Sequence, residues 1–256
     1  MAKAKNNELL NMKILGEGYP VVFLHGFLES NSMWNYLPLM EFGIQCVLIE
    51  LPGHGASSNS NGNPSINNML KRVVSTLEQL EIERCSVIGH SMGGYVALEM
   101  KSQLAFVEKV ILLNSNYWSD TKQKALDRLR IASFIHEGKS LFLKEAVPNL
   151  FLDKKLHKSN IDQLLAEALT MSPEAIAYSS IAMSKRKRHL KLLLEHPHDF
   201  FIIQGDKDPV APKALWNPLI TGNNPNYFEI ENCGHMAHIE KTKEVKKILK
   251  SVFNTI

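Results

Sequence analysis

The chain has 256 residues, enough for one large domain or for a core domain that carries an inserted lobe. Its net charge of +3 does not indicate nucleic-acid binding, and three scattered cysteines argue against a disulfide framework or a Cys-rich zinc site. The first residues lack the apolar run of a signal peptide, and no run is long enough to span a bilayer. We therefore expect a cytoplasmic protein with no membrane segment.

Short apolar runs bounded by Gly, Pro, Asn or Asp recur along the chain, and segments with helical spacing of apolar residues separate several of them. Such runs are typical of strands buried on both faces. Their alternation with helices predicts an α/β fold, with a mostly parallel twisted β-sheet flanked by helices. The expected strands are 20–26, 44–53, 85–90, 109–115, 199–206 and 226–232, and the expected helices of this core are 65–82, 92–103 and 241–256.

The alternation stops between Ser115 and Leu190, where only helical patterns are found. Start signals stand at Ser119-Asp120 and Ser172-Pro173, and Gly138 is a stop signal. We expect residues 115–190 to form a helical cap inserted into a core made of 1–114 and 191–256. Its candidate pocket residues, each equally well explained as packing, are Tyr117, Trp118, Phe134, Phe142, Met171, Tyr178 and Met183.

A serine stands between glycines where an expected strand gives way to an expected helix, in the sequence GHSMGG at 89–94. This G-x-S-x-G pattern is typical of a nucleophile elbow, a turn so tight that flanking side chains would collide. The turn exposes the Ser91 hydroxyl at the edge of the sheet, beside the N-terminus of the following helix. A glycine-rich turn with an incidental serine is the alternative, and the strand–turn–helix context disfavours it.

A serine needs a base, and His235 follows the last expected strand, at the sheet edge where ligands of open α/β sheets bind. His238 is the nearest rival. The acid that orients the imidazole is Asp206 or Asp208, which follow the preceding strand. An oxyanion requires two N–H donors, which we assign to the backbone of Met92, directly after the serine, and of Phe27.

The chain resembles the α/β-hydrolase superfamily, in the branch with a helical cap after the family's sixth strand. The resemblance covers nearly the whole chain and rests on HGF (25–27), LPGHGAS (51–57), GHSMGG (89–94), GDKDP (205–209) and GHMAHIE (234–240). The family's motifs imply Asp208 as the acid and His235 as the base. Some relatives carry an acid after the sixth strand instead, but here that position is NSNYW, without a carboxylate.

The resemblance implies a Ser-His-Asp serine hydrolase that cleaves carboxylic esters of small molecules without a cofactor or metal. Carbon–carbon bond hydrolysis, a related lyase reaction and a purely ligand-binding role remain open, because one fold and triad serve several functions. The basic cluster 185–188 is explained as a solvated face or as a dock for an acyl carrier.

Overall fold

The computed structural model describes residues 9–59, 62–222 and 224–256. In this part of the chain the strands form one sheet, in the order β1-β3-β2-β4-β5-β6-β7. Strand β1 pairs antiparallel with β3, and the other described pairings are parallel, so the predicted α/β sheet is confirmed. The strands are β1 (Met12–Leu15), β2 (Pro20–Leu24), β3 (Gln45–Ile49), β4 (Cys85–His90), β5 (Val107–Leu113), β6 (Phe200–Gly205) and β7 (Tyr227–Ile230).

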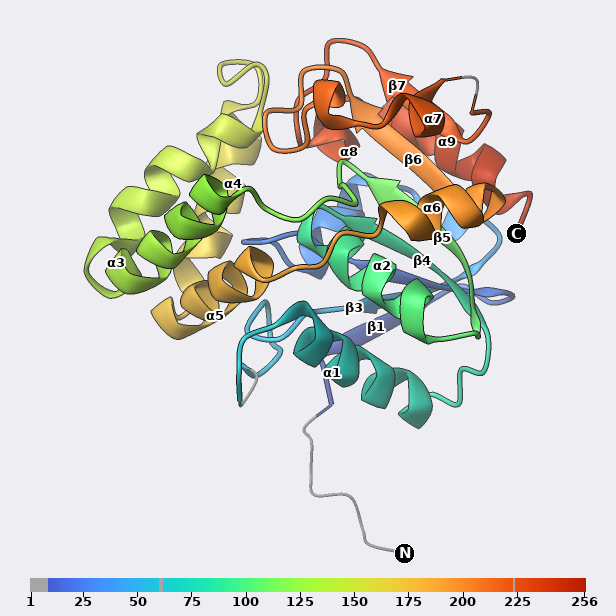
Figure 1. Cartoon of the computed structure of the whole chain (residues 1–256), viewed down its shortest axis with the longest axis horizontal. Coiled ribbons are helices and arrows are strands. Elements are labelled where there is room, and N and C mark those ends of the chain that lie inside the picture. The colour runs from blue at the N-terminus through green and yellow to red at the C-terminus, as the bar shows by residue number, and fades with distance from the viewer. Residues whose placement is uncertain (1–8, 60–61, 223) are drawn as a thin grey trace, which may run out of the picture.

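Alternating side chains of the central strands build a core on each face of the sheet. In β2, Val22 and Leu24 pack into one cluster, and Val21 and Phe23 pack into the other. The first face is covered by α1 (Ile66–Gln79), α2 (Met92–Gln103), α6 (Leu190–Glu195) and α7 (Pro218–Thr221) (Figure 1). The second is covered by α8 (Ala237–Glu240), α9 (Thr242–Phe253) and the short 3-10 helices at Asn31–Tyr36 and Leu39–Glu41.

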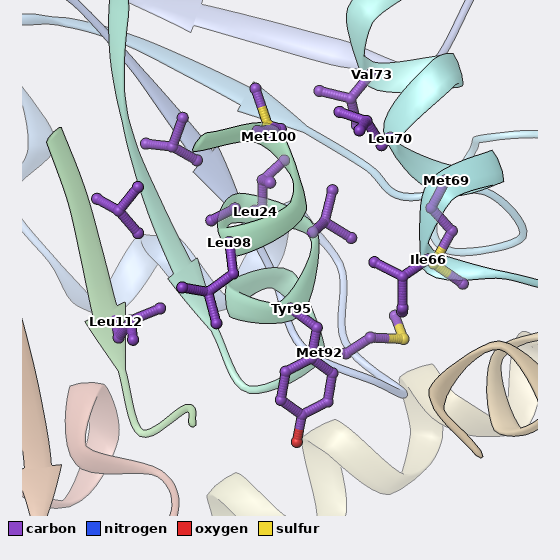
Figure 2. Close-up of a cluster of buried hydrophobic side chains, with 14 of the residues drawn as sticks. Leu24, Ile66, Met69, Leu70, Val73, Met92, Tyr95, Leu98, Met100 and Leu112 are labelled. Atoms are coloured by element: carbon purple, nitrogen blue, oxygen red, sulfur yellow. The ribbon is translucent and has the colours of Figure 1, made fainter. Parts of the chain in front are cut away.

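The first cluster joins the turn after β4 to the core. Figure 2 shows Leu24 of β2, Ile66 of α1, and Met92 and Leu98 of α2, which belong to one cluster of buried side chains. Met92 directly follows Ser91 and is fully buried. Packing against strand β2 and helix α1 therefore fixes the start of α2.

Between β5 and β6 the chain forms a separate helical group. It consists of α3 (Lys122–Ala146), a 3-10 turn at Pro148–Leu150, α4 (Lys158–Thr170) and α5 (Pro173–Ser184), which lie together beside the sheet in Figure 1. These helices share a third apolar cluster, and Leu28 and Met236 of the core join it. The start signal at Ser172-Pro173 is confirmed, because the Ser172 hydroxyl accepts from the Ala175 N–H and Pro173 begins α5.

The predicted helix end at Gly138 is wrong, because α3 continues through it to Ala146. Gly138 is buried, and a Cβ there would overlap the ring of Phe134 one turn earlier. The missing side chain serves close packing within the helix rather than termination. The other start signal shifts slightly, since Thr121 rather than Ser119 or Asp120 caps α3. The short edge strand β1 was not predicted.

Candidate active site

Ser91 lies in a strained turn between β4 and α2, with φ 48° and ψ −114°. The glycines around it are required by contact. A Cβ on Gly93 would meet the carbonyl oxygen of Leu24 in the neighbouring strand, and one on Gly89 would meet the backbone of Gly93. The turn can therefore close only with these residues, and it presents the Ser91 side chain at the carboxyl edge of the sheet.

Three side chains far apart in the sequence form a hydrogen-bonded chain at this edge. The His235 Nε2 atom lies 2.9 Å from the Ser91 Oγ atom. Its Nδ1 atom lies 2.9 and 3.0 Å from the two carboxylate oxygens of Asp208. A proton on Nδ1 donated to Asp208 leaves the Nε2 lone pair free to accept the hydroxyl proton of Ser91. Sequence reasoning predicted these three residues, and the structure brings them together.

The Asp208 carboxylate is buried and accepts hydrogen bonds on both oxygens. The Val210 and Ala211 N–H groups donate to Oδ1, and the side-chain amides of Asn114 and Gln204 donate to Oδ2. Burial alone would raise the pKa of this carboxyl, but the charge and hydrogen bond of His235, with the bonds from Asn114 and Ala211, hold its pKa well below the usual range. The carboxylate therefore stays ionised while it orients the imidazole.

Glu29 and His90 form a second buried pair of an acid and a histidine, next to Asp208 and His235. The sequence did not predict this pair. Glu29 Oε2 lies 2.9 Å from His90 Nδ1, and His90 Nε2 lies 3.0 Å from the carbonyl oxygen of His235. The same Glu29 oxygen accepts from the Gly26 N–H. Burial alone would raise the pKa of Glu29, but the charge and hydrogen bond of His90 lower it to about 2. The pair connects the loop after β2 to the loop of His235.

The two predicted oxyanion donors lie at the same edge. In the part of the chain that the structure describes, the backbone N–H groups of Phe27 and Met92 have no acceptor. Phe27 lines the cavity beside Ser91, and Met92 is the first residue of α2. A negatively charged oxygen is stabilised by two such N–H groups when both point at it beside the nucleophile.

A cavity of about 370 Å³ opens at Ser91 and His235. Its walls come from the loop after β2, the loop after β6 and the inner faces of α3 and α5, and they are mostly apolar. Of the predicted pocket residues, Phe142 and Met183 line it. The other lining residues are Phe27, Leu28, Glu29, His90, Tyr95, Lys124, Asp127, Arg128, Ile131, Ala146, Leu150, Pro209 and Val210.

The other predicted pocket residues do not line this cavity. Tyr117 and Trp118 pack edge-to-face against Trp216, with ring centroids 5.3 and 5.6 Å away. Phe134 lies on the outer side of α3 and is 48% exposed. Tyr178 and Met171 are buried in apolar clusters, Tyr178 with the core and Met171 among the helices. Aromatic character alone did not reveal which way each side chain points.

His238, the rival base, is fully buried against Trp34, Tyr36 and His90. Burial lowers its pKa to about 3, and neither ring nitrogen has a partner among residues 9–59, 62–222 and 224–256. The ring is therefore a neutral packing group. The same residue ranges contain no group of three metal-ligating side chains and no helix with the length and hydropathy of a membrane span.

The basic cluster is only partly a free surface. Arg186 is buried, donates to the Trp118 carbonyl and contacts Asp120. Lys187 pairs with Glu99 at 3.0 Å. Lys185 and Arg188 are exposed. Half of the cluster therefore stabilises the junction between α5 and the core.

A family model described as "Alpha/beta hydrolase family" matches residues 21–248, so the chain belongs to the α/β-hydrolase family. A solved thermophilic esterase from Thermogutta terrifontis superposes with a TM-score of 0.87, covering 96% of this chain and 93% of the esterase at 22% identity. A curated relative, the 2-hydroxy-6-oxo-2,4-heptadienoate hydrolase of Pseudomonas putida, is 22% identical over 91% of this chain and 88% of its own length. These similarities support a hydrolase, whose bond specificity differs among relatives.

Another relative is the dihydrolipoyllysine-residue acetyltransferase component of the acetoin cleaving system of Pseudomonas putida, 25% identical over 90% of this chain. The chain spans only 62% of the length of that protein.

Proposed function

We propose that this protein is a serine hydrolase that cleaves carboxylic esters of small molecules through an acyl-serine intermediate. The observation that carries the proposal is the hydrogen-bonded chain Ser91–His235–Asp208, with 2.9 Å between Ser91 Oγ and His235 Nε2. A serine hydroxyl becomes a nucleophile when a positioned base removes its proton. The apolar cavity beside it has room for a small acyl or alkyl group.

The reaction has two halves. First, Ser91 Oγ attacks the ester carbonyl while its proton moves to His235 Nε2, and the Phe27 and Met92 N–H groups stabilise the oxyanion. The imidazolium then gives its proton to the departing alkoxide, which leaves as an alcohol. Second, His235 takes a proton from water, whose oxygen attacks the acyl carbon. Collapse of this second intermediate releases the carboxylic acid and returns the proton to Ser91.

The helical group at 115–190 acts as a cap in this proposal. Its helices α3 and α5 supply Phe142 and Met183 to the cavity wall, opposite the loops of the core. A cap in this position selects the substrate by shape and excludes water from the reacting atoms. Movement of the cap would admit substrate and release product.

We infer a free small molecule rather than a carrier-bound ester as the substrate. Arg186 and Lys187 of the basic cluster contact Asp120 and Glu99, so only Lys185 and Arg188 remain exposed without an ion-pair partner among the described residues. The three cysteines are buried free thiols, in keeping with the reducing cytoplasm that we propose as the location.

Labelling with a fluorophosphonate probe tests the activated nucleophile. We expect the wild-type protein to be labelled and to hydrolyse p-nitrophenyl butyrate, and Ser91→Ala to lose both, with at least a 10⁴-fold fall in kcat/KM. A vinylogous diketone in the same panel distinguishes carbon–carbon hydrolysis. Turnover of the diketone without turnover of any ester would overturn the ester assignment, and binding without turnover of either would favour a receptor.

A further inference from the structure

The cavity beside Ser91 has a surplus of positive charge on the wall formed by α3. Lys124 and Arg128 both line it, one turn apart on that helix. Arg128 Nε pairs with Asp120 Oδ2 at 2.6 Å, and the guanidinium of Arg186 contacts the other oxygen of the same carboxylate at 2.5 Å. Two guanidinium groups therefore share one buried carboxylate, and their two positive charges exceed its single negative charge.

Lys124 has no carboxylate within ion-pair distance among the residues that the structure describes. Its Nζ atom donates one long hydrogen bond, 3.4 Å, to the carbonyl oxygen of Val210. The other acid on this wall, Asp127, accepts from Gln123 at 2.8 Å and pairs with the exposed Arg130 at 3.0 Å. Lys124 thus lines the cavity without an ion-pair partner among the residues that the structure describes.

The position of this ammonium relative to the reacting serine follows from Val210. The Val210 carbonyl meets Lys124, and the Val210 N–H donates to Asp208 Oδ1 at 2.8 Å. Val210 and Pro209 line the same cavity as Ser91 and His235. A small molecule bound in this cavity therefore has access to the Ser91 hydroxyl and to the ammonium of Lys124.

An unpaired cation in a mostly apolar cavity is unfavourable until an anion joins it. Burial, and then the charge of Arg128, lower the pKa of Lys124 by more than the carboxylates of Asp120 and Asp208 raise it, so its charged form is only partly compensated. The apolar part of the lining, which includes Leu28, Ile131, Phe142 and Leu150, offers nothing to an anion. A ligand that suits this cavity is aliphatic along most of its length and anionic at one point.

We propose that the substrate is a small ester that also carries a free carboxylate, and that Lys124 is the specificity-determining residue that binds this carboxylate while Ser91 attacks the ester carbonyl. The inference rests on the proposed ester hydrolysis and narrows its substrate class. Two arrangements fit: the carboxylate belongs to the acyl part, as in a monoester of a dicarboxylic acid, or to the alcohol part, as in an acylated hydroxy acid.

The test uses two matched pairs of esters that differ by one carboxylate. Monomethyl adipate is compared with methyl hexanoate, and 4-acetoxybutanoate with butyl acetate, by kcat/KM in a pH-stat. For at least one pair we expect the wild type to prefer the anionic ester, and Lys124→Met to reduce that preference at least tenfold. Lys124→Arg should retain most of it. Lys122→Met removes an exposed lysine of the same helix that lies outside the cavity, and should change neither ratio.

Failure of this inference is distinguishable from failure of the hydrolase assignment. Hydrolysis of the esters with both preference ratios unchanged in Lys124→Met overturns the role of Lys124 and leaves ester hydrolysis standing. If the wild type hydrolyses no ester, calorimetric binding of adipate still tests the anion site. Weaker binding to Lys124→Met than to wild type and Lys122→Met supports the site, and equal binding overturns it. Circular dichroism of Lys124→Met and Lys124→Arg establishes that both variants are folded.

Discussion

Asn114 donates a hydrogen bond from its side-chain amide to the carboxylate of Asp208, with 3.0 Å between Nδ2 and Oδ2. Asn114 directly follows β5 and adopts a left-handed conformation with φ 44°, which asparagine tolerates better than most residues. Its amide also donates to the carbonyl oxygen of Gly234, the residue before His235. One side chain thus contacts both the acid and the loop of the base.

The contact between Asn114 and Asp208 predicts what happens when the amide and the carboxylate exchange positions. Asp208→Asn should lower kcat about 10⁴-fold, because an amide cannot hold the imidazole in the required tautomer or stabilise its charged form. The double variant Asn114→Asp/Asp208→Asn has a carboxylate at position 114, next to residue 208. We expect its kcat to be at least tenfold higher than that of Asp208→Asn. The measurement is ester turnover of the single and double variants. No recovery, in a folded double variant, would show that the position after β5 cannot support the base.

The buried pair Glu29–His90 predicts a pH-dependent contribution to stability. Glu29→Gln leaves His90 without its counter-charge, and we expect the free energy of unfolding to fall by about 3 kcal/mol near pH 5.5. The lowered pKa of Glu29, from 4.5 to about 2, corresponds to a contribution of similar size. Urea unfolding monitored by tryptophan fluorescence measures the difference.

The pH window follows from the signs of the two shifts. The contribution of Glu29 is complete above pH 4.5 and is lost as the pH falls toward 2. Burial alone would lower the pKa of His90, but Glu29 raises it, so the contribution of His90 is complete below pH 6.5 and is lost as the pH rises beyond its raised value. The effect of Glu29→Gln should be largest between pH 4.5 and 6.5. Glu174→Gln, which removes the partner of the exposed His136, is the matched control and should show little change at any pH.

Asp120 has no direct contact with Ser91 or His235, and we expect its substitution to change the stability of the protein. Its side chain is fully buried and pairs with Arg128 and Arg186, so Asp120→Asn leaves two guanidinium groups without their carboxylate. We expect a loss of about 3–5 kcal/mol, measured as a lower melting temperature and urea midpoint. Asp127→Asn removes the partner of the exposed Arg130 and should change stability little. Equal effects of the two substitutions would contradict the buried pairing.

Gly93→Ala tests the close approach of α2 to β2. The added Cβ would meet the carbonyl oxygens of Leu24 and His25, which are backbone atoms and cannot rotate away. We expect a loss of several kcal/mol or a failure to fold, as in overpacked cores. Gly43→Ala is the control, because a Cβ there meets no atom within 4 Å and only its φ of 69° opposes the change, at a cost of about 1 kcal/mol. A Gly93→Ala protein as stable as Gly43→Ala would contradict this packing.

Local chemistry made much of the site predictable. Gly89, Ser91 and Gly93 specify a tight turn wherever a strand meets a helix, because only glycine fits beside the neighbouring backbone. Asp208 and His235 follow parallel strands, and the carboxyl ends of parallel strands share one sheet edge. Apolar runs buried on both faces likewise gave the central strands, whereas β1 was missed because it is short and half-exposed.

The sequence by itself therefore determined the α/β sheet, the serine turn and the three polar side chains, because each depends on residues adjacent in the chain or on strand direction. Only the tertiary structure decided which faces of α3 and α5 meet the cavity, because the direction of a side chain depends on how its helix is rotated against the core. That rotation turns Lys124 and Phe142 toward the cavity and Phe134 away from it. Only the assembled fold, likewise, brings Glu29 to His90 and Asn114 to Asp208. These contacts join distant segments, and no pattern of residue spacing in the sequence predicts them.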